Sequence, residues 1–264
     1  MKDIAGKVVL ITGSASGVGY ALATHFVRDR AKLVVVDINE DALRKAISQL
    51  TSMGGEVYPY ICDVADRSQV NELATRVHEK IGPVSILVNN AGVAYRGKLT
   101  DVSDEKHTST INVNIMGCIW MTKEFLPDMV AKKQGNLVYI AGTGGLVGVP
   151  WLTSYCASKH AIVGFAEALR RELRQDNSLR NIQVTTVCPS AAPTVTAEGT
   201  APPQVMRRVE SEKMARQVYR AIKSDQAMLI VPGVSLVKIA FSLVSVANVR
   251  RLLWLFAANI SGRG

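Results

Sequence analysis

The chain has 264 residues, and its 48% hydrophobic content is enough to bury the core of one large α/β domain. The 31 basic and 22 acidic residues give a formal net charge of +9, but the basic residues are interspersed with acidic ones, as on solvated helix faces. We find no zinc-finger, basic-arm or aromatic single-strand motif, so no nucleic acid partner is expected.

Cysteines, histidines and the amino terminus point to a reduced, cytoplasmic protein. The cysteines Cys62, Cys118, Cys156 and Cys188 are far apart, lack CxxC spacing and lie mostly in apolar runs. The four histidines lack metal-ligand spacing, so no metal site is expected. The first residues pass directly into a strand pattern without the apolar segment and cleavage site of a signal peptide, so no export is expected.

A glycine-rich turn lies between the first predicted strand and the first predicted helix. Residues 7–12 (KVVLIT) predict a strand, residues 13–19 (GSASGVG) a tight turn and residues 20–28 a helix. Glycines let the backbone approach a phosphate closely, and a helix N-terminus presents unpaired N–H groups to it. This order of elements near the chain start predicts a site for a dinucleotide pyrophosphate.

Asp37 follows the second predicted strand, residues 32–36, and stands about twenty residues beyond the glycine turn. Its carboxylate can accept the hydroxyls of an adenosine ribose and would repel a 2′-phosphate, which favours NAD over NADP. The alternative is that Asp37 caps the helix predicted for residues 40–51. The glycine turn upstream favours the cofactor role.

Strands and helices continue to alternate along the chain. Further strands are predicted at residues 56–62, 84–89, 136–140, 181–188 and 227–231, and further helices at 67–80, 109–131 and 154–174. This order predicts an α/β, doubly wound Rossmann fold with a mostly seven-stranded parallel sheet, formed by residues 1–232, and an extension at 233–264. Ligands collect where such strands end, and here Asp63 and Val64 follow the third strand and residues 89–92 (NNAG) the fourth.

Two polar features fall inside predicted helices. Asn114 lies in the apolar run NVNIMGCIWM, where a structural role is favoured, either capping backbone groups or ordering a buried polar network. Tyr155 and Lys159 are four residues apart and therefore share one helix face. A cation beside a phenol lowers its pKa from about 10, so the two are a candidate proton-transfer pair. The alternative is a chance pair on a surface helix, which is common at this spacing.

Over residues 7–232 the chain resembles the classical short-chain dehydrogenases/reductases. The matching features occur in the order of that family: residues 12–19 (TGSASGVG), Asp37, Asp63, residues 89–92 (NNAG), Asn114, residues 155–159 (YCASK), and Pro189 with Thr194. A lone YxxxK is a weak signal, but the ordered set is highly specific. Residues 112–129 and 148–165 resemble the branch that acts on hydroxysteroids, retinol and other lipid alcohols.

The resemblance implies a role for each matching residue. Tyr155 would be the acid/base that exchanges a proton with the substrate oxygen, Lys159 would lower its pKa and hold the nicotinamide ribose, and Asn114 would support a water-linked proton relay. Hydride transfer belongs to the cofactor, which is NAD in preference to NADP. The implied cofactor-binding residues are Gly13, Ser14, Ser16, Gly17, Val18, Gly19, Asp37, Ile38, Asp63, Val64, Asn90, Ala91, Gly92, Tyr155, Lys159, Pro189 and Thr194.

Two positions depart from the pattern of the family. The serine usually found thirteen residues before the tyrosine, where it hydrogen-bonds the substrate oxygen, is replaced by Gly142. Loss of one such donor costs roughly a hundredfold in rate, so we expect reduced activity on ordinary ketones unless Thr143 or a water substitutes. Ser190 stands where the family usually has glycine, and the residues after it predict a substrate loop.

These residues favour an NAD(H)-dependent oxidoreductase that interconverts a hydrophobic secondary alcohol and its ketone. One alternative is a cofactor-binding protein in which Gly142 has disabled ordinary turnover, and another is an imine-type reductase that does not need the serine. The family resemblance implies a homodimer or homotetramer.

The apolar tail at residues 235–260 is interrupted only by Lys238, Arg250 and Arg251, and its longest uncharged run is too short to span a bilayer. It either packs on the domain or a sister subunit, or makes a peripheral membrane contact.

Overall fold

A computed structural model of the chain describes residues 3–189, 197–198 and 211–231. Ser190, Thr194, most of the predicted substrate loop and the extension at 233–264 lie outside the described residues. Within the described ranges, no helix has the length and hydropathy that a membrane span requires.

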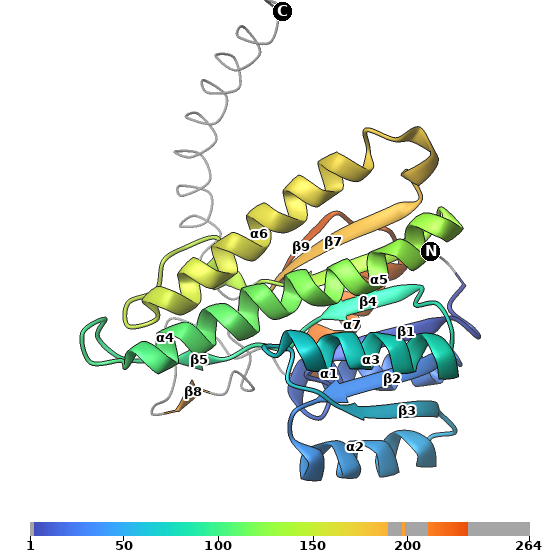
Figure 1. Cartoon of the computed structure of the whole chain (residues 1–264), viewed down its shortest axis with the longest axis horizontal. Helices are drawn as coiled ribbons and strands as arrows, with labels where there is room; N and C mark the ends of the chain where they lie inside the picture. Colours follow the sequence, from blue (N-terminus) through green and yellow to red (C-terminus); the bar gives the residue numbers. More distant parts are fainter. Residues whose placement is uncertain (1–2, 190–196, 199–210, 232–264) are drawn as a thin grey trace, which may run out of the picture.

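The centre of the fold is a seven-stranded sheet in which all strands are parallel (Figure 1). The strands are, in chain order, β1 Val8–Thr12, β2 Lys32–Asp37, β3 Glu56–Ile61, β4 Ile86–Asn89, β6 Gly135–Ile140, β7 Ile182–Pro189 and β9 Met228–Val231. The inner strands β1, β2 and β4 are apolar runs buried along nearly their whole length, as expected for a parallel sheet between two helical layers. The predicted Rossmann fold and its seven strands are confirmed.

Helices cover both faces of this sheet. They are α1 Gly17–Arg28, α2 Glu40–Ser52, α3 Arg67–Lys80, α4 Asp104–Ile111, α5 Cys118–Lys132, α6 Thr153–Leu173 and α7 Ser211–Lys223. One hydrophobic core contains buried residues of α3, α5 and α6, and a second contains those of α1, α2 and α7 on the opposite face (Figure 1). Two apolar layers thus enclose the sheet, as its apolar strands require.

A crevice for ligands follows from the strand order β3-β2-β1-β4-β6-β7-β9. After β3 the chain returns to the middle of the sheet, where β4 pairs with the free side of β1. The loops after β1 and β4 therefore diverge at the carboxyl ends of the strands. Asn90 holds the two loops together, because its Nδ2 donates to the carbonyl oxygens of Thr12 and Gly13, each at 2.9 Å.

The long helix predicted over residues 109–131 starts earlier and is interrupted. α4 begins at Asp104, and a π-helical segment, η1 Asn112–Gly117, separates it from α5. Apolar periodicity does not reveal such a bulge, and π-bulges are frequent at functional sites. The remaining elements are short: the strand pair β5 Ala94–Tyr95 and β8 Ala197–Glu198, and the 3₁₀ turns η2 Thr143–Gly145 and η3 Asn177–Leu179.

Candidate active site

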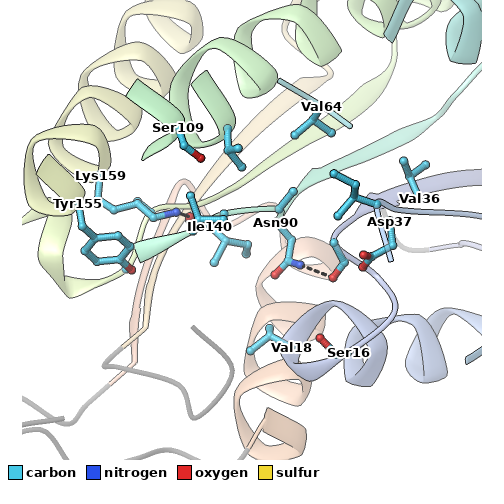
Figure 2. A pocket seen from close by; sticks show the side chains of 18 of the residues that line it. Ser16, Val18, Val36, Asp37, Val64, Asn90, Ser109, Ile140, Tyr155 and Lys159 are labelled. Atoms are coloured by element: carbon cyan, nitrogen blue, oxygen red, sulfur yellow. Dashed lines mark hydrogen bonds between the residues drawn. The ribbon is translucent and has the colours of Figure 1, made fainter. Parts of the chain in front are cut away.

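A cavity of about 400 Å³ opens where the strands end (Figure 2). Its walls come from segments far apart in the sequence, including the glycine turn, the ends of β2 and β3, the NNAG segment and the start of α6. The predicted residues that line it are Gly13, Ser16, Val18, Asp37, Ile38, Asp63, Val64, Asn90, Ala91, Gly92, Tyr155, Lys159 and Pro189. The cofactor motifs and the candidate proton-transfer pair therefore share one cavity.

Some of the predicted cofactor residues lie behind the cavity wall. Ser14 is buried, and its Oγ donates to the carbonyl oxygen of Val36 at 3.2 Å, so its side chain joins the turn to β2, and its cofactor contact stays a prediction. A Cβ at Gly19 would lie 2.2 Å from the carbonyl oxygen of Gly13, so only glycine lets α1 approach the turn this closely. Gly17 is the first residue of α1 and lies outside the cavity lining of the described chain.

The carboxylate of Asp37 is fixed at the end of β2, where it lines the cavity. Its Oδ2 accepts the N–H of Ala15 in the glycine turn at 2.9 Å, and its Oδ1 accepts the N–H of Asn39 at 3.0 Å. The N-cap of α2 is Asn39, whose side chain accepts the N–H of Ala42. The alternative interpretation of Asp37 as the helix cap is therefore wrong, and the carboxylate faces the cavity (Figure 2).

Tyr155 and Lys159 share the cavity-facing side of α6, as their spacing predicts. The Nζ of Lys159 donates to the carbonyl oxygen of Ile140 at 2.9 Å and lies 5.6 Å from the centre of the Tyr155 ring. Burial raises the pKa of Tyr155 and lowers the pKa of Lys159 to about 8. The sequence predicts that Lys159 lowers the pKa of Tyr155, but in the structure this pKa is raised. The Lys159 ammonium lies over the ring face, and the effect of burial on the phenol is larger than the effect of that charge.

Asn114 acts as a buried connector between three segments. Its Oδ1 accepts the N–H of Val93 at 2.8 Å, and its Nδ2 donates to the Val93 carbonyl at 3.0 Å and to Ser158 Oγ at 2.9 Å. It lines a smaller cavity of about 10 Å³, the size of a single water, and not the large cavity. The π segment thereby joins the residues after the NNAG segment to α6, which agrees with the structural role that the sequence favours.

Gly142 stands beside the Tyr155 hydroxyl, at the position where the family resemblance predicts a serine. It has φ +84° and ψ 162°, and a Cβ built on it would lie 3.3 Å from the Tyr155 hydroxyl oxygen. Thr143, the predicted substitute donor, is only 3% exposed and is not among the described residues that line the cavity. Thr143 is thus buried outside this lining, and its role as substitute donor stays a prediction.

Several residues that line the cavity were not predicted: Val36, Cys62, Val93, Tyr95, Ser109, Val113, Ile140, Ala141 and Met214. Cys62 and Val36 directly precede the predicted Asp63 and Asp37, so their places at strand ends were available from the sequence. Met214 comes from α7, and nothing in its local sequence connects it with the site.

Burial of Lys159 should be measurable as a pH effect on stability. The folded-state pKa, about 8, lies below the ordinary value of 10.5, so the unfolded chain holds more protons between these values. The free energy of unfolding should therefore rise with pH from about 8 to 10.5 through this residue, and Lys159→Met should lack the rise. Urea unfolding at several pH values measures this.

The buried cysteines need a control in this experiment. Burial raises the pKa of Cys62, Cys118 and Cys188 to about 12, so they change stability with pH in the opposite sense. The difference between wild type and Lys159→Met cancels the contribution of Cys62, but the Lys159 charge lowers the pKa of Cys118 and Cys188, so the comparison is made in a Cys118→Ala/Cys188→Ala background. Identical pH profiles of the two proteins in that background would contradict the prediction.

Known proteins are similar to this chain in sequence and in architecture. A family model described as short chain dehydrogenase matches residues 7–204. Estradiol 17-beta-dehydrogenase 11 of Rattus norvegicus is 34% identical over 232 residues, which cover 88% of this chain and 77% of the relative. Epidermal retinol dehydrogenase 2 of Mus musculus is 38% identical over 235 residues, covering 88% and 75%.

A solved structure extends the likeness to three dimensions. The short chain dehydrogenase/reductase from Burkholderia phymatum in complex with NAD has a TM-score of 0.78 and 28% identity, and the match covers 87% of this chain and 90% of that one. With a family model that matches from β1 to beyond β7, and relatives above 30% identity over most of the chain, the protein belongs to the short-chain dehydrogenase family.

Proposed function

We propose that the protein is an NAD(H)-dependent dehydrogenase that interconverts a hydrophobic secondary alcohol and its ketone. Its family makes it an oxidoreductase of CH–OH groups that uses a nicotinamide dinucleotide. The observation that carries the finer proposal is the placement of Tyr155 and Lys159 in the same cavity as Asp37 and the glycine turn. Acid/base chemistry and dinucleotide binding therefore meet in one place.

The residues of the cavity fit a dinucleotide. The start of α1 with its glycine turn suits a pyrophosphate, Asp37 suits an adenosine ribose, and Asp63 lies where the adenine would rest. When bound, the nicotinamide accepts or supplies the hydride. Tyr155 would give a proton to the substrate oxygen in reduction and remove it in oxidation. Lys159, whose Nζ lies 5.6 Å from the Tyr155 ring centre, would hold the nicotinamide ribose beside it.

Asp37→Ala should weaken the preference for NAD. The wild-type carboxylate is held by two backbone N–H groups and would repel a 2′-phosphate, so we expect NADH to bind at least about tenfold more tightly than NADPH. The variant should lose most of this difference, as measured by fluorescence titration of both cofactors. Asp41→Ala, which removes an exposed carboxylate of α2, is the matched control. Equal affinities of the wild type for NADH and NADPH would contradict the proposed preference for NAD.

The substrate side of the proposal rests on apolar lining and on the relatives. Val93, Val113 and Ile140 line the cavity, and two relatives are named as estradiol and retinol dehydrogenases. The test is NADH formation from NAD with a panel of steroid, retinoid and small secondary alcohols. We expect turnover with at least one hydrophobic alcohol, and weaker turnover with the small ones.

The missing serine favours a second candidate function, a cofactor-binding protein with little dehydrogenase activity. The position beside the Tyr155 hydroxyl carries no side chain, because it is Gly142. Tight NADH binding without turnover of any alcohol or ketone in the panel would favour this candidate over the dehydrogenase.

A further inference from the structure

The helix that carries Tyr155 starts without a side-chain cap. The N-cap residue of α6 is Leu152, and no side chain of the described residues caps the first turn. Trp151, directly before it, has a left-handed φ of +65°. Unpaired N–H groups at a helix start make the first turn the least stable part of a helix. Tyr155 is the third residue of α6, so its position depends on what else holds this turn.

Hydrogen bonds to the neighbouring helix lie on both sides of Tyr155. Before it, the Oγ of Ser154 lies 2.6 Å from Nδ1 of His107 in α4. After it, the Oγ of Ser158 accepts from Asn114 at 2.9 Å and donates to the carbonyl oxygen of Tyr155 at 2.7 Å. The start of α6 is thereby tied to α4 and to the π segment, one residue before and three residues after Tyr155.

The second ring nitrogen of His107 defines its tautomer. Nε2 lies 3.2 Å from the carbonyl oxygen of Leu99, which can only accept a hydrogen bond. Nε2 therefore carries the hydrogen, and Nδ1 accepts from the Ser154 hydroxyl. The N–H of Gly97 also donates to the carbonyl oxygen of Trp151 at 3.0 Å. The segment 96–99, which follows the cavity-lining Tyr95, is thus joined to the first turn of α6.

We propose that His107 is a positioning residue for the reaction. Through Ser154 it holds the first turn of α6, and through Leu99 it holds the segment next to Tyr95. His107 is not among the described residues that line the cavity, so it acts through these partners. Loss of the hydrogen bond between His107 and Ser154 shifts the Tyr155 hydroxyl relative to the substrate oxygen and thereby lowers kcat. The inference rests on the proposed dehydrogenase function.

Two amide variants separate the two hydrogen bonds of the ring. In His107→Asn, Oδ1 replaces Nδ1 and keeps an acceptor for Ser154, while in His107→Gln, Nε2 keeps the donor to Leu99 and the Ser154 bond is lost. We expect His107→Gln and Ser154→Ala to lower kcat about tenfold with little change in NADH affinity. His107→Asn should retain most of kcat, because it keeps the bond to Ser154. It should raise the KM of the alcohol, because it loses the bond to Leu99 that holds the segment next to the cavity-lining Tyr95. Thr108→Ala, exposed on the same helix, is the control.

Hydrogen exchange gives a readout that does not depend on turnover. The N–H of Cys156 donates to the Leu152 carbonyl at 2.8 Å, so amides 156–159 report on the first turn. They should exchange about tenfold faster in His107→Gln and in Ser154→Ala than in wild type and His107→Asn. The double variant His107→Gln/Ser154→Ala should show the same exchange rates as either single variant, because each substitution removes the same hydrogen bond.

The outcomes distinguish this inference from the proposed function. Equal kcat and equal exchange in wild type and all variants would overturn the positioning role of His107. An inactive wild type that still shows the predicted exchange differences would instead contradict the dehydrogenase proposal and leave the hydrogen-bonded link intact.

Discussion

Replacing Tyr155 by phenylalanine should lower kcat about a thousandfold and leave the affinity for NADH nearly unchanged. The variant keeps the aromatic ring near the Lys159 ammonium, 5.6 Å from the ring centre, and loses only the hydroxyl. Because the phenol is the acid/base of the proposed reaction, the loss falls on the proton-transfer step and not on cofactor binding. Steady-state kinetics with the best alcohol of the panel and fluorescence titration of NADH measure the two effects.

The matched control for this variant is Tyr58→Phe. Tyr58 lies on β3, and its hydroxyl bonds to Glu56 at 2.5 Å near the surface, outside the described lining of the cavity. It should keep wild-type kinetics. If Tyr155→Phe retained more than about a tenth of the wild-type kcat, another group would be transferring the proton and the role of Tyr155 would be wrong.

The fold could be predicted because its signals are local. Each inner strand is a short run of buried apolar residues, and α2, for example, buries Leu43, Ala46 and Leu50 at helical spacing. The π segment at Asn112–Gly117 escaped prediction for a physical reason. Its Asn114 bonds to Val93 and Ser158, which lie 21 and 44 residues away in the chain, so the bulge depends on tertiary contacts that periodicity does not contain.

The site could be predicted in outline but not in its backbone detail. Residues at strand ends, such as Asp37 and Asp63, meet because parallel strands end at one edge of the sheet. The directions of side chains in glycine-rich turns could not be predicted in this way, because each direction depends on the φ and ψ of a single residue. The Ser14 hydroxyl bonds to β2, and Thr143 is buried after the positive-φ turn at Gly142.

A serine at position 142 should supply the missing hydrogen bond, but its effect must be measured against alanine at the same position. The φ of +84° and ψ of 162° lie in a region almost restricted to glycine. Any side chain here should lower the free energy of unfolding by about 1–3 kcal/mol and crowd the Tyr155 hydroxyl, 3.3 Å from its Cβ. Gly142→Ala has the same strain as Gly142→Ser without the hydroxyl.

We therefore expect Gly142→Ser to exceed Gly142→Ala about a hundredfold in kcat/KM, the usual effect of one donor to a developing charge. Gly148→Ala is the stability control from the same loop, because a Cβ there meets no atom within 4 Å. Equal activity of the two variants at 142 would contradict the idea that the substrate oxygen lacks a second donor. Tyr95 and Ser109, which also bring hydroxyl-bearing side chains to the cavity, would then be the next positions to substitute in the search for the donor.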